Sequence, residues 1–495
     1  MKNKRSSGLL LHITSLPGKY GIGTMGKEAY AFVDFLEKAG QKIWQILPLG
    51  HTGYGDSPYQ CFSAFAGNPL LIDLDLLVKD GLLSKTHLPK NKNFDHYKVD
   101  FGRVFTYKYP ILREAFKLFK ENSEKKIKNE YRRFVEESKF WIDDYAFFMA
   151  LKDHFGGKSL AQWNIDIKTR QEDAMATYRQ ELDDQIKFYY FVQYAFFTQW
   201  QALKKYANDR EISIIGDIPL YVAADSSDSW AKTHLFDYDH DLNPITVAGV
   251  PPDYFSVTGQ LWGNPIYKWN VHQQNGFAWW IERVRANLVL YDIVRIDHFR
   301  GLAAYWAVPF GEDTAINGQW IEAPGKDLMQ AIINALGNAP IIAEDLGVIT
   351  PDVEELRDGF NLPGMKILQF AFDSGEENDF MPHTFVKNCV VYTGTHDNDT
   401  TLGQYKSVKP ADRKLMKEYF ELDTKDPAWS FVKLAWSTVA DVAIAPLQDI
   451  LRLGSQARMN FPGKAAGNWM WRFKKGDLNN QHIKELHKIT RLYGR

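Results

Sequence analysis

Eight short apolar segments run through this sequence, and they constrain its fold more than any other feature. They lie at residues 8–13, 43–47, 212–215, 288–296, 340–343, 365–372, 389–393 and 442–446. Runs of this length are typical of buried strands in a parallel sheet. Several are flanked by amphipathic segments that predict helices, at residues 27–38, 276–286, 327–335, 352–357 and 427–441. Eight buried strands with helices between them predict an α/β fold, a (β/α)8 TIM barrel.

The chain is too long for a plain barrel. It has 495 residues, whereas a plain barrel takes about 250, so roughly half of the chain is expected to be insertion. Residues 50–210 are predicted to form a mostly helical subdomain, because their middle is rich in Lys and Glu with apolar residues at helical spacing. Residues 225–275 are predicted to be a loop-rich, aromatic insertion. No repeat or linker is visible, so residues 1–495 are expected to form a single barrel domain.

Charge and cysteine content exclude several classes of protein. The net charge is −2 with no basic excess, so no electrostatic footprint for nucleic acid is present. The two cysteines, Cys61 and Cys389, form no CxxC metal pair and no disulfide framework. The apolar run at residues 9–11 is too short for a signal peptide or a membrane span. We therefore expect a cytoplasmic protein with no membrane or nucleic-acid partner.

Carboxylates follow four of the predicted strands. They are Asp217, Asp297, the pair Glu344 and Asp345, and Asp397. In a barrel the carboxyl ends of all strands open on one face, so these side chains are expected to meet there. Each one alone also suits a helix cap or a turn. Together with Arg295 and His396 they favour a functional acidic cluster.

A carboxylate cluster without metal-ligand spacing indicates glycosidic bond chemistry, in which one acid is protonated and another is ionised. Arg295 lies two residues before Asp297 and hence on the same strand face. It is expected to lower the pKa of Asp297 and keep that side chain ionised as a nucleophile. Glu344 ends an apolar run beside Asp345. Those surroundings are expected to raise its pKa and favour Glu344 as the acid/base.

Three further motifs could also mark ligand sites or a lid. Residues 21–26 match GxGxxG, but residues 15–20 separate them from the preceding strand, so a nucleotide site is not expected. Residues 237–241 begin like a calcium loop that lacks its later Gly and Glu, and they are predicted to form an exposed turn. Residues 249–265 combine aromatics with Gly and Pro. They are either a lid over the site or a loop pinned by its aromatics.

Several stretches closely resemble the amylomaltases, the 4-alpha-glucanotransferases or disproportionating enzymes of glycoside hydrolase family 77. They are the GYGDSPYQ motif at residues 53–60 and residues 214–219, 250–265, 294–301, 342–347, 392–400, 457–460 and 468–469. The likeness runs from residue 8 to residue 472. It implies a (β/α)8 barrel with inserted subdomains, no C-terminal β domain and no cofactor.

The resemblance also implies roles for individual residues. The nucleophile motif falls on Asp297, the acid/base on Glu344 and the transition-state stabiliser on Asp397. The positions that hold the donor sugar are Arg295, His396 and Asp217. The positions that line the substrate groove are Tyr54, Asp56, Ser57, Tyr59, Tyr254, Phe255, Trp262, Asp373 and Asn460. Phe101 stands where relatives are expected to carry Tyr, so an outer sugar contact there is not expected to carry over.

The expected activity is that of a retaining transglycosylase. It would move α-1,4-glucan segments between maltooligosaccharides through a covalent glucosyl-Asp intermediate and release glucose or short glucans. Maltooligosaccharides and longer α-1,4-glucans are the expected donors and acceptors. Two alternatives stay open, an α-glucan hydrolase with the same residues and a noncatalytic sugar-binding barrel. The sequence predicts neither the oligomeric state nor the preferred donor length.

Overall fold

Eight parallel strands form the centre of the molecule. The computed structural model describes residues 5–53, 55–88, 93–252, 256–374, 378–464 and 466–495. The strands are β1 (Ser6–Leu10), β2 (Ile43–Gln45), β3 (Ser213–Ile218), β6 (Ile293–Ile296), β9 (Ile341–Ala343), β10 (Gly364–Ile367), β11 (Cys389–Tyr392) and β12 (Val442–Pro446). Their order is β10-β11-β12-β1-β2-β3-β6-β9. The Ala343 N–H donates to the Pro363 carbonyl at 3.0 Å, which links β9 to the start of β10 and closes the ring. The predicted (β/α)8 barrel is confirmed.

Three predicted strands have different ends in the structure. Residues 288–290 complete helix α11, and β6 begins only at Ile293. A buried helix end and a buried strand share the same apolar pattern, so periodicity cannot separate them. Strand β3 extends to Ile218, so Asp217 lies inside the strand rather than after it. Strand β10 ends at Ile367 and continues as the 3-10 turn η7 (Leu368–Phe370).

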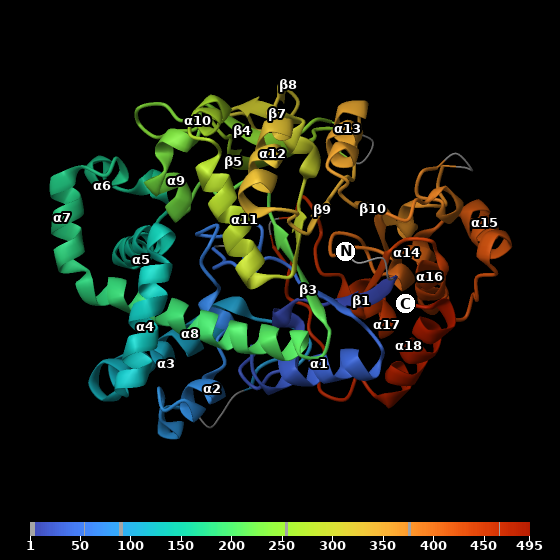
Figure 1. Cartoon of the computed structure of the whole chain (residues 1–495), viewed down its shortest axis with the longest axis horizontal. Helices are drawn as coiled ribbons and strands as arrows, with labels where there is room; N and C mark the ends of the chain where they lie inside the picture. Colours follow the sequence, from blue (N-terminus) through green and yellow to red (C-terminus); the bar gives the residue numbers. More distant parts are fainter. Residues whose placement is uncertain (1–4, 54, 89–92, 253–255, 375–377, 465) are drawn as a thin grey trace.

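Helices surround the barrel (Figure 1). The ones that connect or follow the strands are α1 (Lys27–Lys38), α8 (Asp183–Asn208), α11 (Ala278–Leu290), α12 (Gly325–Leu336), α13 (Pro351–Gly359), α14 (Thr401–Ser407), α15 (Pro410–Phe420), α16 (Pro427–Ser437), α17 (Leu447–Ile450) and α18 (Asn480–Tyr493). Between β10 and β11 the described residues form the 3-10 turns η7 and η8 (Pro382–Thr384) in place of an α-helix. After β12 the described residues add helices and no further strand.

The long segment between β2 and β3 is largely helical. It contains α2 (Leu74–Lys79), α3 (Phe101–Asn122), α4 (Lys125–Glu137), α5 (Lys139–His154), α6 (Ile165–Lys168) and α7 (Glu172–Glu181), followed by α8. Figure 1 shows these helices gathered on one side of the barrel. The charged helix α4 has no buried residue, whereas α5 and α8 carry the aromatic residues that pack this region together.

The second insertion is more regular than the sequence predicted. Strands β4 (Thr246–Val250) and β5 (Gln260–Pro265) pair with β7 (Ala304–Pro309) and β8 (Gln319–Glu322) in an antiparallel sheet of order β5-β4-β7-β8. The short helices α9 (Ser227–Ala231) and α10 (Trp269–Gln274) flank it in the sequence. The prediction of a loop-rich insertion at residues 225–275 therefore missed strands β4 and β5, and β7 and β8 were not predicted at all.

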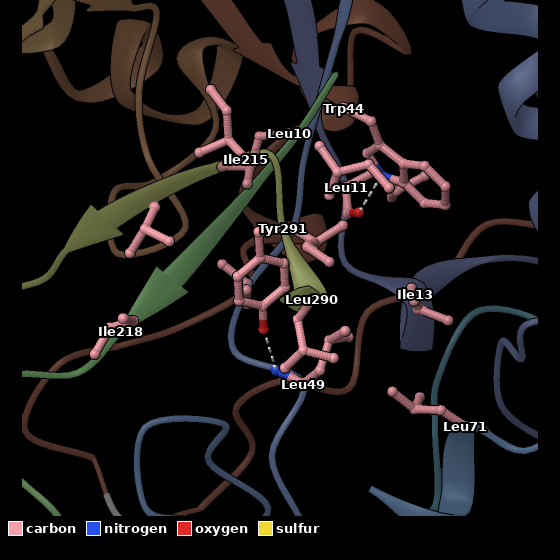
Figure 2. Close-up of a cluster of buried hydrophobic side chains, with 14 of the residues drawn as sticks. Leu10, Leu11, Ile13, Trp44, Leu49, Leu71, Ile215, Ile218, Leu290 and Tyr291 are labelled. Carbon is pink, nitrogen blue, oxygen red and sulfur yellow. Dashed lines mark hydrogen bonds between the residues drawn. The ribbon is translucent and has the colours of Figure 1, made fainter. Parts of the chain in front are cut away.

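The barrel core positions the strands that carry the acids. Figure 2 shows Leu10, Ile215 and Tyr291 packed together among the strands. A Cβ atom on Gly216 would lie 2.1 Å from the Tyr291 ring, so only glycine allows this ring to lie against β3. The Leu49 N–H donates to the Tyr291 hydroxyl at 3.3 Å. These contacts fix β3 beside the start of β6, and the acids described below lie at the opposite, carboxyl ends of these two strands.

Of the described helices, none combines the length and the apolar character that crossing a membrane requires.

Candidate active site

The carboxyl ends of four neighbouring or facing strands bring the acids together. In the register between β3 and β6, Asp217 lies directly opposite Arg295. Asp297 follows β6, and Glu344 follows β9. His396 and Asp397 follow β11 on the far side of the same mouth. Parallel strands of a barrel all present these ends to one face, so side chains far apart in sequence meet there.

Arg295 joins two of these carboxylates. Its Nε and Nη2 donate to the two oxygens of Asp217 at 3.0 and 2.5 Å. Nη2 also donates to Oδ1 of Asp297 at 2.8 Å. The side chains of Arg295 and Asp217 are 4% and 1% exposed, whereas that of Asp297 is 30% exposed. Asp217 and Arg295 therefore form the floor of the site, and Asp297 is the acid that a ligand can reach.

The pKa of Asp297 is shifted upward, whereas the sequence predicted a downward shift. Burial raises the pKa of Asp297 well above its usual range, and the Arg295 guanidinium opposes that rise. The other carboxylates, Asp217, Glu344 and Asp397, add to the increase. The expected net lowering was wrong because burial and three like charges outweigh one guanidinium. Since Glu344 contributes repulsion only when it is ionised, a proton on Glu344 favours ionised Asp297.

Glu344 has the properties of a protonated acid. Its Oε2 accepts the His298 N–H at 2.6 Å, and its Oε1 accepts the Leu346 N–H at 3.2 Å. Burial raises the pKa of Glu344 to about 7, against the opposing effects of Arg295 and the His298 N–H. His298 has a φ of 53°, in the left-handed region that few non-glycine residues adopt. This backbone geometry accompanies the N–H bond that orients Glu344.

Asp345 does not join the cluster. Its Oδ1 accepts the Met365 N–H at 2.6 Å, and its Oδ2 accepts from Arg357 at 2.6 Å. It is 7% exposed. Asp345 therefore ties β9 to β10 and leaves Glu344 as the acid of this pair that faces the site.

A second segment of the chain clasps Asp397. Asn460 Nδ2 donates to Oδ1 of Asp397 at 2.6 Å. Arg458 donates from Nη2 to the Asp397 carbonyl and from Nε to the Asn460 carbonyl, both at 2.7 Å. His396 Nε2 lies 3.4 Å from Oδ2 of Asp397. Burial lowers the pKa of His396, so a neutral imidazole stands beside the Asp397 carboxylate.

Three rings form a wall beside the acids. Tyr59 and His396 are stacked, with ring centroids 5.1 Å apart and an interplanar angle of 17°. Trp469 lies 5.7 Å from Tyr59 and 5.9 Å from His396. The Tyr59 hydroxyl donates to Oδ2 of Asp217 at 2.6 Å. Aromatic faces of this kind provide a platform against the apolar face of a sugar.

A pocket of about 260 Å³ lies over these groups. Its lining includes the predicted residues Ser57, Tyr59, Trp262, Asp297, His396, Asp397 and Asn460. Lining residues with polar or aromatic side chains that were not predicted as site residues are Gln60, Tyr221, Gln260, Asn264, His298 and Trp469. Gln60 and Trp469 lie within motifs that the family resemblance covers. Asn264 lies within residues 250–265, which the resemblance also covers, whereas Tyr221 gave no signal in the sequence, because only the fold brings it to the pocket.

The remaining predicted residues lie elsewhere or are not described. Tyr54, Tyr254 and Phe255 fall outside the residues that the structure describes. Asp56 and Asp373 do not line the pocket. Burial and Asp100 raise the pKa of Asp56 to about 6, and Asp373 is exposed and accepts from Ser374 at 2.9 Å.

Phe101 begins helix α3 and is 6% exposed. A side chain buried to this extent presents little surface to a sugar.

The two competing motifs do not form ligand sites. A Cβ atom at Gly26 would lie 2.1 Å from Oδ2 of Asp73, so a carboxylate already occupies the start of α1 where a phosphate would bind. Asp239 accepts backbone bonds from Asp241 and Asn243 at 2.9 and 2.8 Å, which closes a local turn. Within the described part of the chain, no group of three or more His, Cys, Asp or Glu side chains is arranged to hold a metal ion.

Comparisons with known proteins extend this picture across the whole chain. The profile of the 4-alpha-glucanotransferase family matches residues 11–479. A 4-alpha-glucanotransferase of Synechocystis sp. is 50% identical over 100% of this chain and 99% of that protein. One of Thermus thermophilus is 48% identical over 99% of each. The solved structure of an amylomaltase from Streptococcus agalactiae in complex with acarbose has a TM-score of 0.97 at 44% identity, over 99% of this chain and 100% of that one.

Proposed function

Because this chain belongs to the 4-alpha-glucanotransferase family, we propose that it is a retaining transglycosylase that uses Asp297, Glu344 and Asp397. It transfers segments of α-1,4-glucans between maltooligosaccharides. The observation that carries this proposal is the meeting of a carboxyl group of pKa about 7, Glu344, with an Arg-paired carboxylate, Asp297, at one mouth of the barrel. Glycosidic bond cleavage with retention requires one protonated carboxyl group and one ionised carboxylate. A proton on Glu344 removes its repulsion and favours ionised Asp297, which Arg295 also favours.

In the first step Glu344 gives its proton to the glycosidic oxygen as the bond from that oxygen to the anomeric carbon breaks. An Asp297 oxygen attacks the anomeric carbon from the opposite face and forms a glucosyl ester. The departing glucan leaves as glucose or a short chain. The Arg295 contact, at 2.8 Å, orients Asp297 for this attack.

Asp397 stabilises the transition state in both steps. Asn460 and His396 fix its carboxylate, and it accepts hydroxyls of the sugar more strongly as the ring flattens and positive charge develops. Asp217, Arg295 and His396 hold the same sugar from below. Tyr59 lies in the wall of the pocket, where its ring can contact the apolar face of that sugar.

In the second step Glu344, now ionised, takes the proton of a 4-hydroxyl on an acceptor glucan. The new glycosidic bond forms as the ester to Asp297 breaks, so the anomeric configuration is retained. Transfer requires that a sugar hydroxyl, rather than water, attacks the ester. Trp262 supports this choice, because it lines the pocket and its ring centroid lies 4.7 Å from that of His298, whose N–H bonds to Glu344. We propose Trp262 as part of the surface against which the acceptor binds.

The products from maltotriose test transfer against hydrolysis. Transfer predicts a ladder of longer maltooligosaccharides together with glucose, at nearly constant reducing ends. Hydrolysis predicts rising reducing ends without elongation. Chromatography of the products with a reducing-end assay separates the two outcomes, and a result without elongation would overturn the proposal.

A Glu344→Gln variant tests the acid. We expect the turnover of maltotriose to fall by about 10²- to 10⁴-fold. With an α-maltosyl fluoride donor, whose leaving group needs no proton, formation of the enzyme-bound ester should persist. Detection of that ester on Asp297 by mass spectrometry of the digested protein would locate the nucleophile. Unchanged turnover of maltotriose would show that another residue is the acid, or that the reaction takes place at a different site.

We infer a reducing compartment, the cytoplasm, from the thiol chemistry. Cys61 and Cys389 are both free, and burial raises the pKa of each thiol to about 12. Thiols in that state are unreactive and are suited to a compartment in which disulfides do not form.

A further inference from the structure

A second pocket, of about 300 Å³, lies between α5, α9 and α11. We call it the α5–α11 pocket, and its lining includes Phe65, Phe140, Trp141, Asp228, Asn275 and Trp279. It shares no lining residue with the pocket over Asp297. Figure 1 shows α5, α9 and α11 on the same flank of the molecule, where the helical insertion adjoins the barrel. It is therefore a separate cavity at the junction of two parts of the chain.

Aromatic rings surround Phe65 at this pocket. Its centroid lies 5.3 Å from that of Phe140, 6.5 Å from that of Trp141 and 6.1 Å from that of Trp279. Phe140 is 43% exposed, although large apolar side chains usually avoid water. Its ring is thus the part of this aromatic group that is open to a ligand, while the other rings are held in place by packing.

Two of the three carboxylates that line the pocket have cationic neighbours. Asp144 pairs with Arg170 and Lys232 at 3.1 and 3.4 Å, and Glu282 contacts Arg285 at the exposed end. Burial raises the pKa of the third carboxyl group, Asp228, which favours its neutral form. The pocket therefore offers little net attraction to a free cation or a phosphate. A neutral ligand with many hydroxyls fits this pattern best.

Asp228 and Asn275 offer places for hydroxyl groups. Asp228 is 5% exposed, and its Oδ2 accepts the Ala64 N–H at 2.7 Å. The buried Trp279 indole N–H lies against Asp228 and opposes the rise in pKa that burial causes in this carboxyl group. Asp228 can bond to a sugar hydroxyl from inside the pocket, and the exposed Asn275 side chain can bond to another at the rim.

One loop separates the two pockets. Ser57, Tyr59 and Gln60 line the pocket over the acids, and Ser63 and Phe65, a few residues later, line the α5–α11 pocket. Helix α9 anchors this loop, because the Ser227 N–H donates to the Phe62 carbonyl at 2.8 Å in addition to the Asp228 bond to Ala64. The cavity is therefore next to the loop that carries part of the catalytic wall.

We propose that the α5–α11 pocket binds glucose residues of a long α-glucan at a distance from the reacting bond. This inference rests on the proposed function. The aromatic group receives the apolar face of the sugar, and Asp228 and Asn275 bind its hydroxyls. The volume of about 300 Å³ is at the lower end of ligand pockets and suits one or two sugar units. Long donors and acceptors gain a second attachment point that short oligosaccharides cannot reach while they react.

Kinetics with long and short donors test this site. Phe140→Ala removes the exposed ring, and Ala278→Leu fills the pocket rim without adding a flat ring. For each variant we expect the KM for amylose to rise about 3- to 10-fold, whereas kcat/KM for maltotriose stays within about twofold of the wild type. Phe105→Ala, which removes a similarly exposed ring from α3 of the same insertion, is the matched control and should change neither value.

The outcomes are distinguishable. An unchanged amylose KM in both pocket variants would overturn the proposal. An equal loss with amylose and maltotriose would also overturn it, because that result indicates a distorted loop rather than a lost binding site. Affinity electrophoresis in amylose gels gives a second readout, in which both pocket variants should be retarded less than Phe105→Ala. If the wild type forms no elongated products from maltotriose, the proposed function fails, whatever the retardation in amylose gels.

Discussion

At the scale of single residues, the contacts of Arg295 divide the acids into two kinds. Its guanidinium bonds to Asp217 and Asp297 but makes no hydrogen bond to Glu344 among the described contacts. Glu344 instead accepts two backbone N–H groups, which stabilise a carboxylate less than a guanidinium does. Burial therefore raises the pKa of Glu344 to about 7, where it can donate and later accept a proton.

The raised pKa predicts how stability depends on pH. A carboxyl group whose pKa is about 7 in the folded protein and about 4.3 when unfolded binds a proton more readily when folded. Its favourable contribution is present below about pH 4 and is lost as the pH rises through 7. Glu344→Gln removes the cost of ionisation, so we expect it to be more stable than the wild type at pH 8, by on the order of 1 kcal/mol.

Chemical denaturation of both proteins at pH 5 and pH 8 measures this effect. The advantage of Glu344→Gln should be larger at pH 8 than at pH 5. Glu354→Gln, an exposed change on α13, should show no such difference. Equal stability of Glu344→Gln and the wild type at both values would mean that Glu344 ionises in the folded protein as readily as in the unfolded chain.

For single residues, the sequence predicted which side chains meet better than it predicted their burial and their pKa. The two-residue spacing of Arg295 and Asp297 correctly predicted that their side chains meet, at 2.8 Å. The net pKa of Asp297 was not predictable, because it depends on burial and on three acids from other strands. Tyr221 reaches the pocket from a loop after β3, and no local pattern marks such a residue.

At the scale of elements, two segments after different strands hold one another at the active site. Residues 395–399 follow β11, and residues 458–469 follow η9 (Ser455–Ala457). The Asn460 N–H donates to the His396 carbonyl at 3.1 Å, and Arg458 bonds to the backbone of both segments. The guanidinium also lies 4.4 Å from the Phe461 ring centroid. Arg458 is thus a positioning residue for Asp397.

Removal of Arg458 should impair catalysis more than stability. Arg458→Ala deletes the bonds to the Asp397 and Asn460 carbonyls, so Asp397 loses its fixed orientation. We expect kcat with maltotriose to fall about 10- to 100-fold, because transition-state contacts depend on orientation, with a change in unfolding free energy of about 1 kcal/mol. Lys464→Ala is the matched control, since Lys464 lies 4.5 Å from the same Phe461 ring.

The control shows whether a loss of activity comes from altered packing on Phe461 or from a displaced Asp397. Lys464→Ala should retain kcat within about twofold, although it removes a cation from the same ring. Equal losses of kcat in the two variants would assign the effect to the Phe461 contact and contradict a specific role for Arg458. Steady-state kinetics with maltotriose and thermal unfolding of the three proteins provide both readouts.

Elements were predictable where burial is uniform. Each of the eight barrel runs contains a strand whose residues are almost all buried. Strands β7 and β8 were missed because they are not uniformly buried. Strand β7 mixes buried with partly exposed positions, and β8 has no buried residue, as in its exposed Trp320. Their pairing with β4 stabilises them more than their own composition does. Residues 288–290 show the opposite error, because they were predicted as a strand but form the end of helix α11.

At the scale of the whole molecule, the ring of strands is closed where β9 meets β10. One backbone bond, from Ala343 to Pro363, joins the two strands, and Asp345 supplements it. Its carboxylate accepts the Met365 N–H and pairs with Arg357. A Cβ atom at Gly364 would lie 2.3 Å from Oδ2 of Asp345, so the carboxylate packs tightly on β10. The sequence predicted a closed barrel, but it could not reveal which side chain secures the closure.

Asp345→Ala should therefore destabilise the entire fold. It leaves the Met365 N–H and one end of Arg357 without a partner in a buried setting, where the side chain of Asp345 is 4% exposed. Breaking a buried ion pair of this kind costs about 3 kcal/mol. Asp358→Ala removes the other carboxylate that pairs with Arg357, but Asp358 is 65% exposed, and an exposed pair contributes about 0.5 kcal/mol. Denaturant unfolding of the two variants thus compares two acids on the same guanidinium.

The comparison also distinguishes closure of the barrel from the charge of Arg357. Because Asp345 is buried and Asp358 is exposed, loss of the ion pair alone already affects stability to different degrees in the two variants. Hydrogen exchange identifies the closure, because loss of the β9–β10 link should increase exchange first in β9 and β10, and only in Asp345→Ala. Because β9 also carries Glu344 at its end, Asp345→Ala should lower kcat at temperatures where the protein is still folded. A destabilisation that leaves the exchange of β10 and kcat unchanged would show that other contacts close the ring.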